Sequence, residues 1–170
     1  MSELDQTDFR GPQYPLGMKP LLIASLVFGV TAWAAAQQDP VGHPAGYKAF
    51  EQVRSMDRPQ EPTHGTVFLN AAAASITTAG QPYPYGSVVI MEWRKGGKDG
   101  EVARLDVMRK ERGYGAAYGA DKNGDWEYAS YSPDGKLITD AAASLACAKC
   151  HLKAGVSKDF VYIGRFAPPK

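Results

Sequence analysis

Residues 87–110, with the sequence SVVIMEWRKGGKDGEVARLDVMRK, decide the fold of this chain. Ser87–Trp93 contains a run of β-branched residues and ends in an aromatic one, a composition typical of a strand. Gly96–Gly100 is rich in glycine and has the composition of a hairpin turn, so Glu101–Lys110 is predicted to return as a second strand. The stretch therefore predicts an antiparallel sheet.

Further strands and a short helix are predicted on either side of this hairpin. Gly65–Leu69 and Trp126–Tyr131 have strand composition, and Ser132–Gly135 has the composition of a turn that closes the second of them. Asn70 is placed to cap a short alanine-rich helix that runs through Thr78. Together these segments indicate an α+β domain with several short antiparallel strands and flanking helices.

Two more helices are predicted near the ends of this domain. One covers Tyr47–Met56 and ends before Pro59, because apolar residues recur there at helical spacing, namely Tyr47, Phe50, Val53 and Met56. The other is capped by Thr139 or Asp140 and runs into the only two cysteines of the chain. The 170 residues suit one domain, and a net charge of +1 without a lysine or arginine run argues against nucleic-acid binding.

The sequence Cys147-Ala-Lys-Cys150-His151 carries the chemistry of the chain. Cys-x-x-Cys-His is the attachment signal for haem c. On a helix the two cysteines lie on one face about one turn apart, so both can reach the vinyl groups at one edge of a single porphyrin. His151 follows directly and is the predicted proximal iron ligand. We expect one covalently attached haem c, within a fold other than the all-α cytochrome c fold.

Other kinds of site also use a Cys-x-x-Cys pair. A zinc site lacks further ligands here, because there is no second cysteine pair and His43 and His64 lie far upstream without metal-type spacing. A thioredoxin-like dithiol needs a βαβ context that the sequence does not show. A plain disulfide remains the third alternative, and the histidine after the second cysteine favours haem over all three.

Residues 20–36 form an uncharged, mostly apolar stretch that ends in small residues. Because haem c is attached outside the cytoplasm, we expect this segment to direct export, and the protein to be periplasmic in a bacterium. If Met18 is the start, the segment is a signal peptide that is cleaved near Ala36. If Met1 is the start, the segment is a retained anchor in the inner membrane. Both alternatives stay open.

The predicted organisation follows from these features. Residues 1–36 form a leader, residues 37–46 a linker, and residues 47–170 the haem domain. Contact with a membrane is expected only if residues 20–36 are retained.

Several short motifs follow one another between His43 and Tyr162. They are the segment Tyr47–Met56, His64-Gly65, Gly86-Ser-Val-Val-Ile-Met-Glu92, Val107-Met-Arg-Lys110, Asp125-Trp-Glu-Tyr128, Ser132-Pro-Asp-Gly135, Cys147–His151 and Asp159-Phe-Val-Tyr162. Their order and spacing resemble the cytochrome P460 family, which includes the cytochromes c′-beta. The resemblance implies a curved antiparallel sheet packed against the haem face opposite the proximal histidine. It also implies a homodimer, and an iron that is five-coordinate or weakly six-coordinate.

Met91 marks a departure from part of that family. In the hydroxylamine-oxidising members a lysine at this position is cross-linked to the porphyrin, and a methionine cannot form that bond. Those members also use a distal carboxylate on the next strand, where the matching stretch is Arg109-Lys110-Glu111 and Glu111 is the only acid. The cytochromes c′-beta, which lack the lysine and bind nitric oxide or carbon monoxide under an apolar cap, are the closer match.

Strand alternation places Val89, Met91 and Trp93 on one face of the predicted strand. If the lysine position of the family faces the haem, Met91 faces it too. Its thioether is then either a sixth iron ligand or a soft filler of an apolar distal pocket. Phe68 is a candidate distal cap, and Arg109 is a candidate partner for a bound ligand or a haem propionate.

Three functions remain open. The first is an exported mono-haem c cytochrome that binds nitric oxide or a similar ligand on the distal side, transfers single electrons, or does both. The second is a membrane-anchored electron-transfer subunit of a respiratory or photosynthetic complex. The third is a hydroxylamine-type oxidoreductase, which Met91 disfavours. We expect a gas-binding or electron-carrying protein rather than an enzyme, with weak peroxidase turnover at most, and a diatomic ligand or a redox protein as partner.

Overall fold

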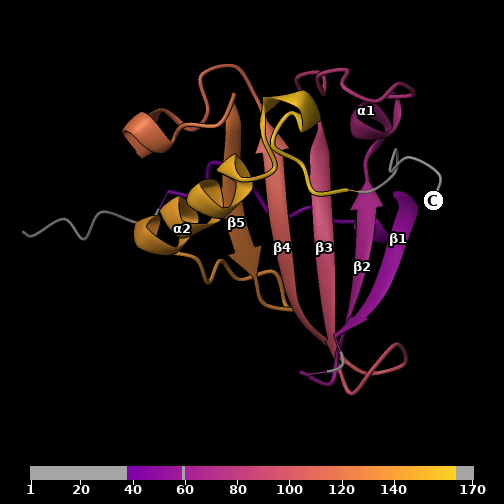
Figure 1. Cartoon of the computed structure of the whole chain (residues 1–170). Helices are drawn as coiled ribbons and strands as arrows, with labels where there is room; N and C mark the ends of the chain where they lie inside the picture. The colour runs from indigo at the N-terminus through magenta and orange to yellow at the C-terminus, as the bar shows by residue number, and fades with distance from the viewer. Residues whose placement is uncertain (1–37, 59, 164–170) are drawn as a thin grey trace, which may run out of the picture. The chain divides into compact units, whose positions relative to one another are not determined.

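The computed structural model describes residues 38–58 and 60–163. Within them, consecutive strands pair antiparallel in one five-stranded sheet of order β1-β2-β3-β4-β5 (Figure 1). The strands are β1 (Glu51–Arg58), β2 (Thr63–Leu69), β3 (Val88–Lys95), β4 (Val102–Lys110) and β5 (Trp126–Tyr131). The predicted α+β class with an antiparallel sheet is confirmed.

The helices of the described residues are short apart from the one that carries the cysteines. They are α1 (Ala71–Ala74), α2 (Ala141–Leu152) and the 3-10 turns η1 (Tyr47–Ala49), η2 (Ala116–Asp121) and η3 (Val156–Lys158). Asp140 caps α2, because its carboxylate accepts a hydrogen bond of 2.8 Å from the Ala143 amide. Asn70 caps α1 in the same way, although α1 ends well before Thr78. α2 packs against β5 and η2 on one side of the sheet (Figure 1).

The helix predicted over Tyr47–Met56 is wrong, since this segment forms η1 followed by β1. β1 contains a bulge between Gln52 and Arg54, where Val53 has no cross-strand partner. The extra residue shifts the alternation of the strand by one, so Val53 and Met56 both pack against the same core although they are three residues apart. A bulged strand therefore imitates the spacing of an amphipathic helix.

The sheet has an apolar core on each side. We call the side toward α2 the cavity face; it carries Val67, Val89, Met91, Met108 and Tyr128. The other side, which we call the opposite face, carries Phe68, Ile90, Val107, Ala129 and Tyr131. Strand alternation separates the two sets, because neighbouring residues of one strand point to different faces.

Residues 37–46 were predicted to form a linker. In the structure, the described part of this segment packs against the domain from residue 39 onward. Val41 is fully buried in the core of the opposite face. Asp39 accepts a hydrogen bond of 2.6 Å from the Tyr131 hydroxyl, and the Pro40 carbonyl accepts one of 2.5 Å from the Tyr114 hydroxyl. The domain therefore begins before Tyr47. The predicted leader, residues 1–36, lies outside the described residues.

Within residues 38–58 and 60–163, no helix has the length and apolar character needed to cross a bilayer.

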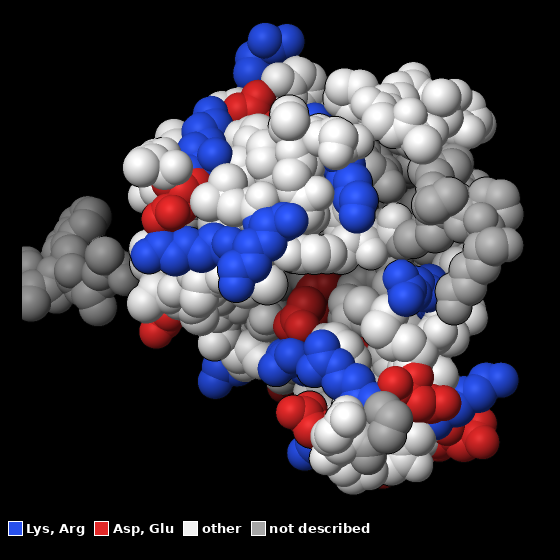
Figure 2. Space-filling view, viewed as in Figure 1, with Lys and Arg blue, Asp and Glu red and all other residues white. Residues whose placement is uncertain are grey.

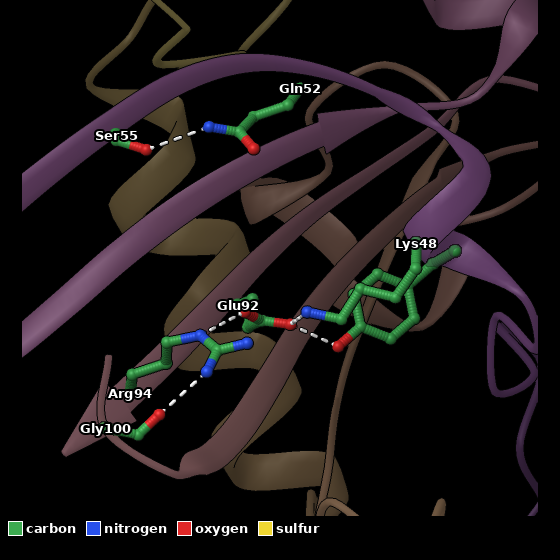
Figure 3. A network of polar contacts seen from close by, with 7 residues as sticks. Lys48, Gln52, Ser55, Glu92, Arg94 and Gly100 are labelled. Carbon is green, nitrogen blue, oxygen red and sulfur yellow. Dashed lines mark hydrogen bonds and ion pairs between the residues drawn. The ribbon is translucent and has the colours of Figure 1, made fainter. Parts of the chain in front are cut away.

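A buried carboxylate ties two loops to the opposite face. Glu92 accepts hydrogen bonds from Lys48, Tyr47 and the Arg94 guanidinium, the last at 2.7 Å (Figure 3). Arg94 also donates to the Gly100 carbonyl at 2.7 Å. Burial raises the pKa of Glu92, but the three donors outweigh it and hold this pKa below its ordinary value. η1 and the β3–β4 turn are thus attached to β3 through one charge.

Candidate functional site

A cavity of about 670 Å³ lies between α2 and the cavity face. Cofactor pockets commonly have volumes of about 300–1,000 Å³. All five strands, α2 and the segment after η3 contribute to its walls. Figure 2 shows this side of the domain hollowed at its centre, with acidic atoms inside the hollow and basic side chains around it.

α2 brings Cys147, Cys150 and His151 to the wall of this cavity. Cys147 is partly buried and Cys150 is exposed, and the two thiols are not joined by a disulfide. Burial raises the pKa of the Cys147 thiol, and nearby Asp106 acts in the same direction. Both sulfurs are therefore free for covalent attachment of a cofactor.

The imidazole of His151 is oriented by the backbone after η3. Its Nδ1 donates a hydrogen bond of 2.7 Å to the Phe160 carbonyl. That bond places the proton on Nδ1 and leaves the Nε2 lone pair available to a metal. Burial lowers the pKa of His151, which the hydrogen bond to the carbonyl partly opposes, so the neutral ring is favoured. A neutral, oriented imidazole is the form that binds iron.

Aromatic rings hold His151 against the sheet. The Tyr128 ring lies 4.8 Å from the imidazole, and the Tyr162 ring lies 5.3 Å from it, between ring centroids. Asn123 links Tyr128 to α2, because its amide donates both to the Tyr128 hydroxyl at 2.8 Å and to the Ala148 carbonyl at 3.0 Å. Asn123 therefore holds the helical turn of α2 that carries the cysteines in place over the sheet.

On the sheet side of the cavity, β3 contributes Val89, Met91 and Trp93, and β2 contributes Val67. Gly65 allows the two larger side chains to lie against β2. A Cβ atom at Gly65 would come within 2.9 Å of Trp93 Cζ3 and 3.0 Å of Met91 Sδ. Both side chains therefore depend on the absence of a side chain at this position.

Asp106 is a cavity residue that the sequence analysis missed. It lies on β4, directly opposite Met91 in the ladder, and lines the cavity. Its carboxylate accepts hydrogen bonds from Trp93 Nε1 at 2.7 Å and from Ser130 Oγ at 2.7 Å. Arg104 approaches the same carboxylate through Nε at 2.8 Å and Nη2 at 3.0 Å. The cavity thus contains a fixed acidic group beside an apolar wall.

Residues 44–163 match the family model of cytochrome P460. The chain belongs to the cytochrome P460 family. No curated protein matches the chain. The match begins just before η1 and takes in every strand, α2 and the last described residue of the cavity wall. Membership implies a haem cofactor and identifies the chain as a cytochrome.

The cavity of this cytochrome P460 protein fits a haem group. Two free thiols and an imidazole with an available Nε2 lie on one wall, and apolar side chains lie on the other. Three guanidinium groups, those of Arg54, Arg58 and Arg104, also line it. Guanidinium groups bind carboxylates such as the two haem propionates. Within the described residues, no cluster of three or more histidine, cysteine, aspartate or glutamate side chains could hold a zinc ion instead.

Two residues proposed from the sequence for the distal pocket of this cytochrome lie elsewhere, which corrects their assignment. Phe68 is part of the core of the opposite face, where its ring meets that of Tyr47 at 5.4 Å. Arg109 pairs with Val88, which is also in that core. Each follows directly after a residue that faces the cavity, so strand alternation turns its side chain to the opposite face.

The Arg109-Lys110-Glu111 stretch therefore does not supply the distal carboxylate of this cytochrome P460 protein. None of the three residues lines the cavity, and the carboxylate on this strand that does so belongs to Asp106.

Proposed function

We propose that this member of the cytochrome P460 family is an exported mono-haem c cytochrome of the periplasm. In this proposal it binds a small ligand such as nitric oxide at the haem, and it exchanges single electrons there. The observation that carries the proposal is the cavity itself, which joins Cys147, Cys150 and His151 on α2 to an apolar sheet wall. Haem iron supplies a site for diatomic ligands and for one-electron transfer, tuned by the polarity of its surroundings.

The residues on α2 hold the cofactor in this proposal. Cys147 and Cys150 bond to it through thioethers, and His151 Nε2 is the proximal ligand. The hydrogen bond from His151 Nδ1 to the Phe160 carbonyl keeps the imidazole in one orientation. Arg54, Arg58 or Arg104 neutralises the propionates at the cavity rim.

The sheet side restricts what reaches the iron. Val67, Val89 and Met91 present apolar surface, which disfavours water and charged molecules in that part of the cavity. Met91 carries no amine and so forms no cross-link to the porphyrin. Its flexible thioether fills the pocket and leaves the iron free for a small ligand.

Spectra of the purified protein test this proposal. Haem should stay with the chain in acidified acetone, and Cys147→Ala/Cys150→Ala should lose it under the same treatment. A high-spin ferric spectrum, with binding of nitric oxide on reduction, supports ligand binding. A low-spin spectrum with a methionine-to-iron band shows that electron transfer is the main role. A colourless chain contradicts both.

Export and assembly are parts of the same proposal. Cell fractionation should find the haem protein in the periplasm, either soluble or held at the inner membrane. Amino-terminal sequencing of the native protein separates signal cleavage near Ala36 from retention of residues 20–36. Analytical ultracentrifugation should show a homodimer.

A second candidate function is favoured by Asp106. A carboxylate inside the cavity, held by Trp93, Arg104 and Ser130, could transfer protons to or from a small nitrogen or oxygen substrate. This would make the protein an oxidoreductase of the hydroxylamine or peroxide type, without the cross-link that the lysine-containing relatives use. Steady-state turnover of these two substrates tests it.

A further inference from the structure

Asp159 and Phe160 adopt a backbone conformation that side-chain-bearing residues rarely use. Their φ angles are 46° and 63°, and no other non-glycine residue of the described chain has a positive φ. Aspartate tolerates this left-handed region better than most residues, whereas a phenylalanine is an outlier there. Two such residues in succession persist only where the surrounding structure holds them.

Three hydrogen bonds to Asp159 hold the turn that Asp159 and Phe160 form. Its Oδ2 accepts hydrogen bonds from Lys110 Nζ at 2.6 Å and from the Tyr83 amide at 2.9 Å. Its backbone carbonyl accepts a third, of 2.9 Å, from Trp126 Nε1. Asp159 and Lys110 are each only 8% exposed, so this is a buried ion pair.

The carbonyl that follows this turn is the one that orients the proposed iron ligand. Phe160 O accepts the 2.7 Å hydrogen bond from His151 Nδ1. The Phe160 amide is also fixed, because it donates to the Gly155 carbonyl at 3.0 Å. A continuous series of contacts therefore runs from Lys110 at the end of β4, through Asp159 and Phe160, to His151 on α2.

We propose that Lys110 and Asp159 are positioning residues for the iron ligand His151. Their ion pair holds the left-handed turn in the one arrangement that presents the Phe160 carbonyl to Nδ1. A firm acceptor at Nδ1 makes the imidazole more electron-rich at Nε2, and electron-rich axial ligands favour ferric over ferrous iron. This inference rests on the proposed haem function. It adds two residues that influence the midpoint potential of the haem through the ligand His151.

The test compares two lysine variants of the haem-loaded protein. Lys110→Met removes the partner of buried Asp159, and Lys48→Met removes a partner of buried Glu92 on the opposite face. Two quantities are measured: solvent exchange of the His151 Nδ1 proton, followed as a hyperfine-shifted NMR line, and the haem midpoint potential. Unfolding by urea is recorded for both variants.

Lys110→Met should make the Nδ1 proton exchange about tenfold faster, because its acceptor is no longer held. At the wild-type midpoint potential, its reduced-to-oxidised ratio should rise about threefold or more. Lys48→Met should leave both quantities at wild-type values. Lys110→Arg, which keeps the charge, should restore part of each change.

An unchanged exchange rate and potential in Lys110→Met, with only lower stability, overturn the inference and make the pair a plain fold contact. If Lys110→Met does not fold, Asp159→Asn takes its place, since it keeps an acceptor for the Tyr83 amide and removes the charge. A wild-type chain without covalent haem refutes the proposed function and this inference together. A haem-bearing wild type with an unaltered variant refutes the inference alone.

Discussion

Met91 lies directly opposite Asp106 in the β3–β4 ladder, and both side chains line the same cavity. Cross-strand partners lie about 4.5–5.5 Å apart at their Cβ atoms, so a soft apolar group and a carboxylate share one part of the wall. Where the hydroxylamine-oxidising relatives carry a lysine, this chain carries a group without charge or amine. The acid beside it is instead paired with Arg104.

Met91→Leu should leave the ferric haem in the spin state of the wild type. Leucine has a similar volume, so the free energy of unfolding should fall by less than about 1.5 kcal/mol. Electron paramagnetic resonance and urea unfolding measure the two effects. A change from low to high spin would show that the Met91 sulfur is an iron ligand, contrary to the role of filler.

Asp106→Asn should reduce any turnover of hydroxylamine or peroxide by about 100-fold, because it removes a proton-transfer group from the cavity. Binding of carbon monoxide to the reduced protein should change little. Asp134→Asn, in an exposed turn away from the cavity, is the matched control. Equal turnover in the two variants would remove the support for the second candidate function.

Gly65→Ala should lower the free energy of unfolding by about 1–3 kcal/mol, since its new methyl group overlaps the Trp93 ring and the Met91 sulfur. It should also slow association of the ligand, because both side chains move toward the cavity. Adding Trp93→Phe, which removes the overlapping ring atoms, should recover part of the loss. A double-mutant cycle measures this coupling, and strictly additive effects would contradict the contact.

Glu92→Gln should cost about 2 kcal/mol near pH 7, because Lys48 and Arg94 lose their charged partner. The hydrogen bonds hold the folded-state pKa of Glu92 below its unfolded value of about 4.3. The stabilisation is therefore present above that value and is lost as the pH falls through the folded-state pKa.

Urea unfolding at several pH values between about 7 and 3 checks this dependence. The difference between wild type and Glu92→Gln should narrow toward the acid end of that range. Glu101→Gln, which changes an exposed residue, should show no such dependence. A constant difference over the whole range would contradict the role assigned to the Glu92 charge.

Local signals in the sequence predicted much of the fold. β5 has the predicted bounds, and Asp140 caps α2 as expected for one of the two candidates. Composition suffices to predict β3 and β4 as strands. Their β-branched and apolar residues favour extended backbone, and the glycine-rich turn between them favours a hairpin. The cysteine motif is likewise local, so the chemistry on α2 needed no knowledge of the tertiary structure.

The face on which a β4 residue lies could not be predicted from the sequence, because the β3–β4 ladder is irregular. Counting back from the hairpin, where the Lys95 amide bonds to the Glu101 carbonyl, an unbroken ladder would pair Met91 with Leu105. The register instead shifts between Trp93 and Arg94, which pairs Met91 with Asp106. A shift of one residue exchanges the two faces of β4.

The same shift accounts for Arg109, which an unbroken ladder would have turned toward the cavity. The bulge at Val53 has a similar effect on β1, where it produced the false helical spacing. Neither irregularity has a proline or glycine beside it that could signal it in the sequence. The prediction for Phe68 was wrong for a different reason. Strand alternation separates the two faces of β2 but does not say which of them faces α2.

The strictly sequential strand order has a consequence for how the protein assembles. Each hairpin closes between neighbours in the chain, so no pair of strands has to be brought together across an intervening strand. α2 follows the last strand, and synthesis runs from the amino end. All five strands of the cavity wall therefore emerge before the two sulfurs and the imidazole, and the segment after η3 closes the wall last.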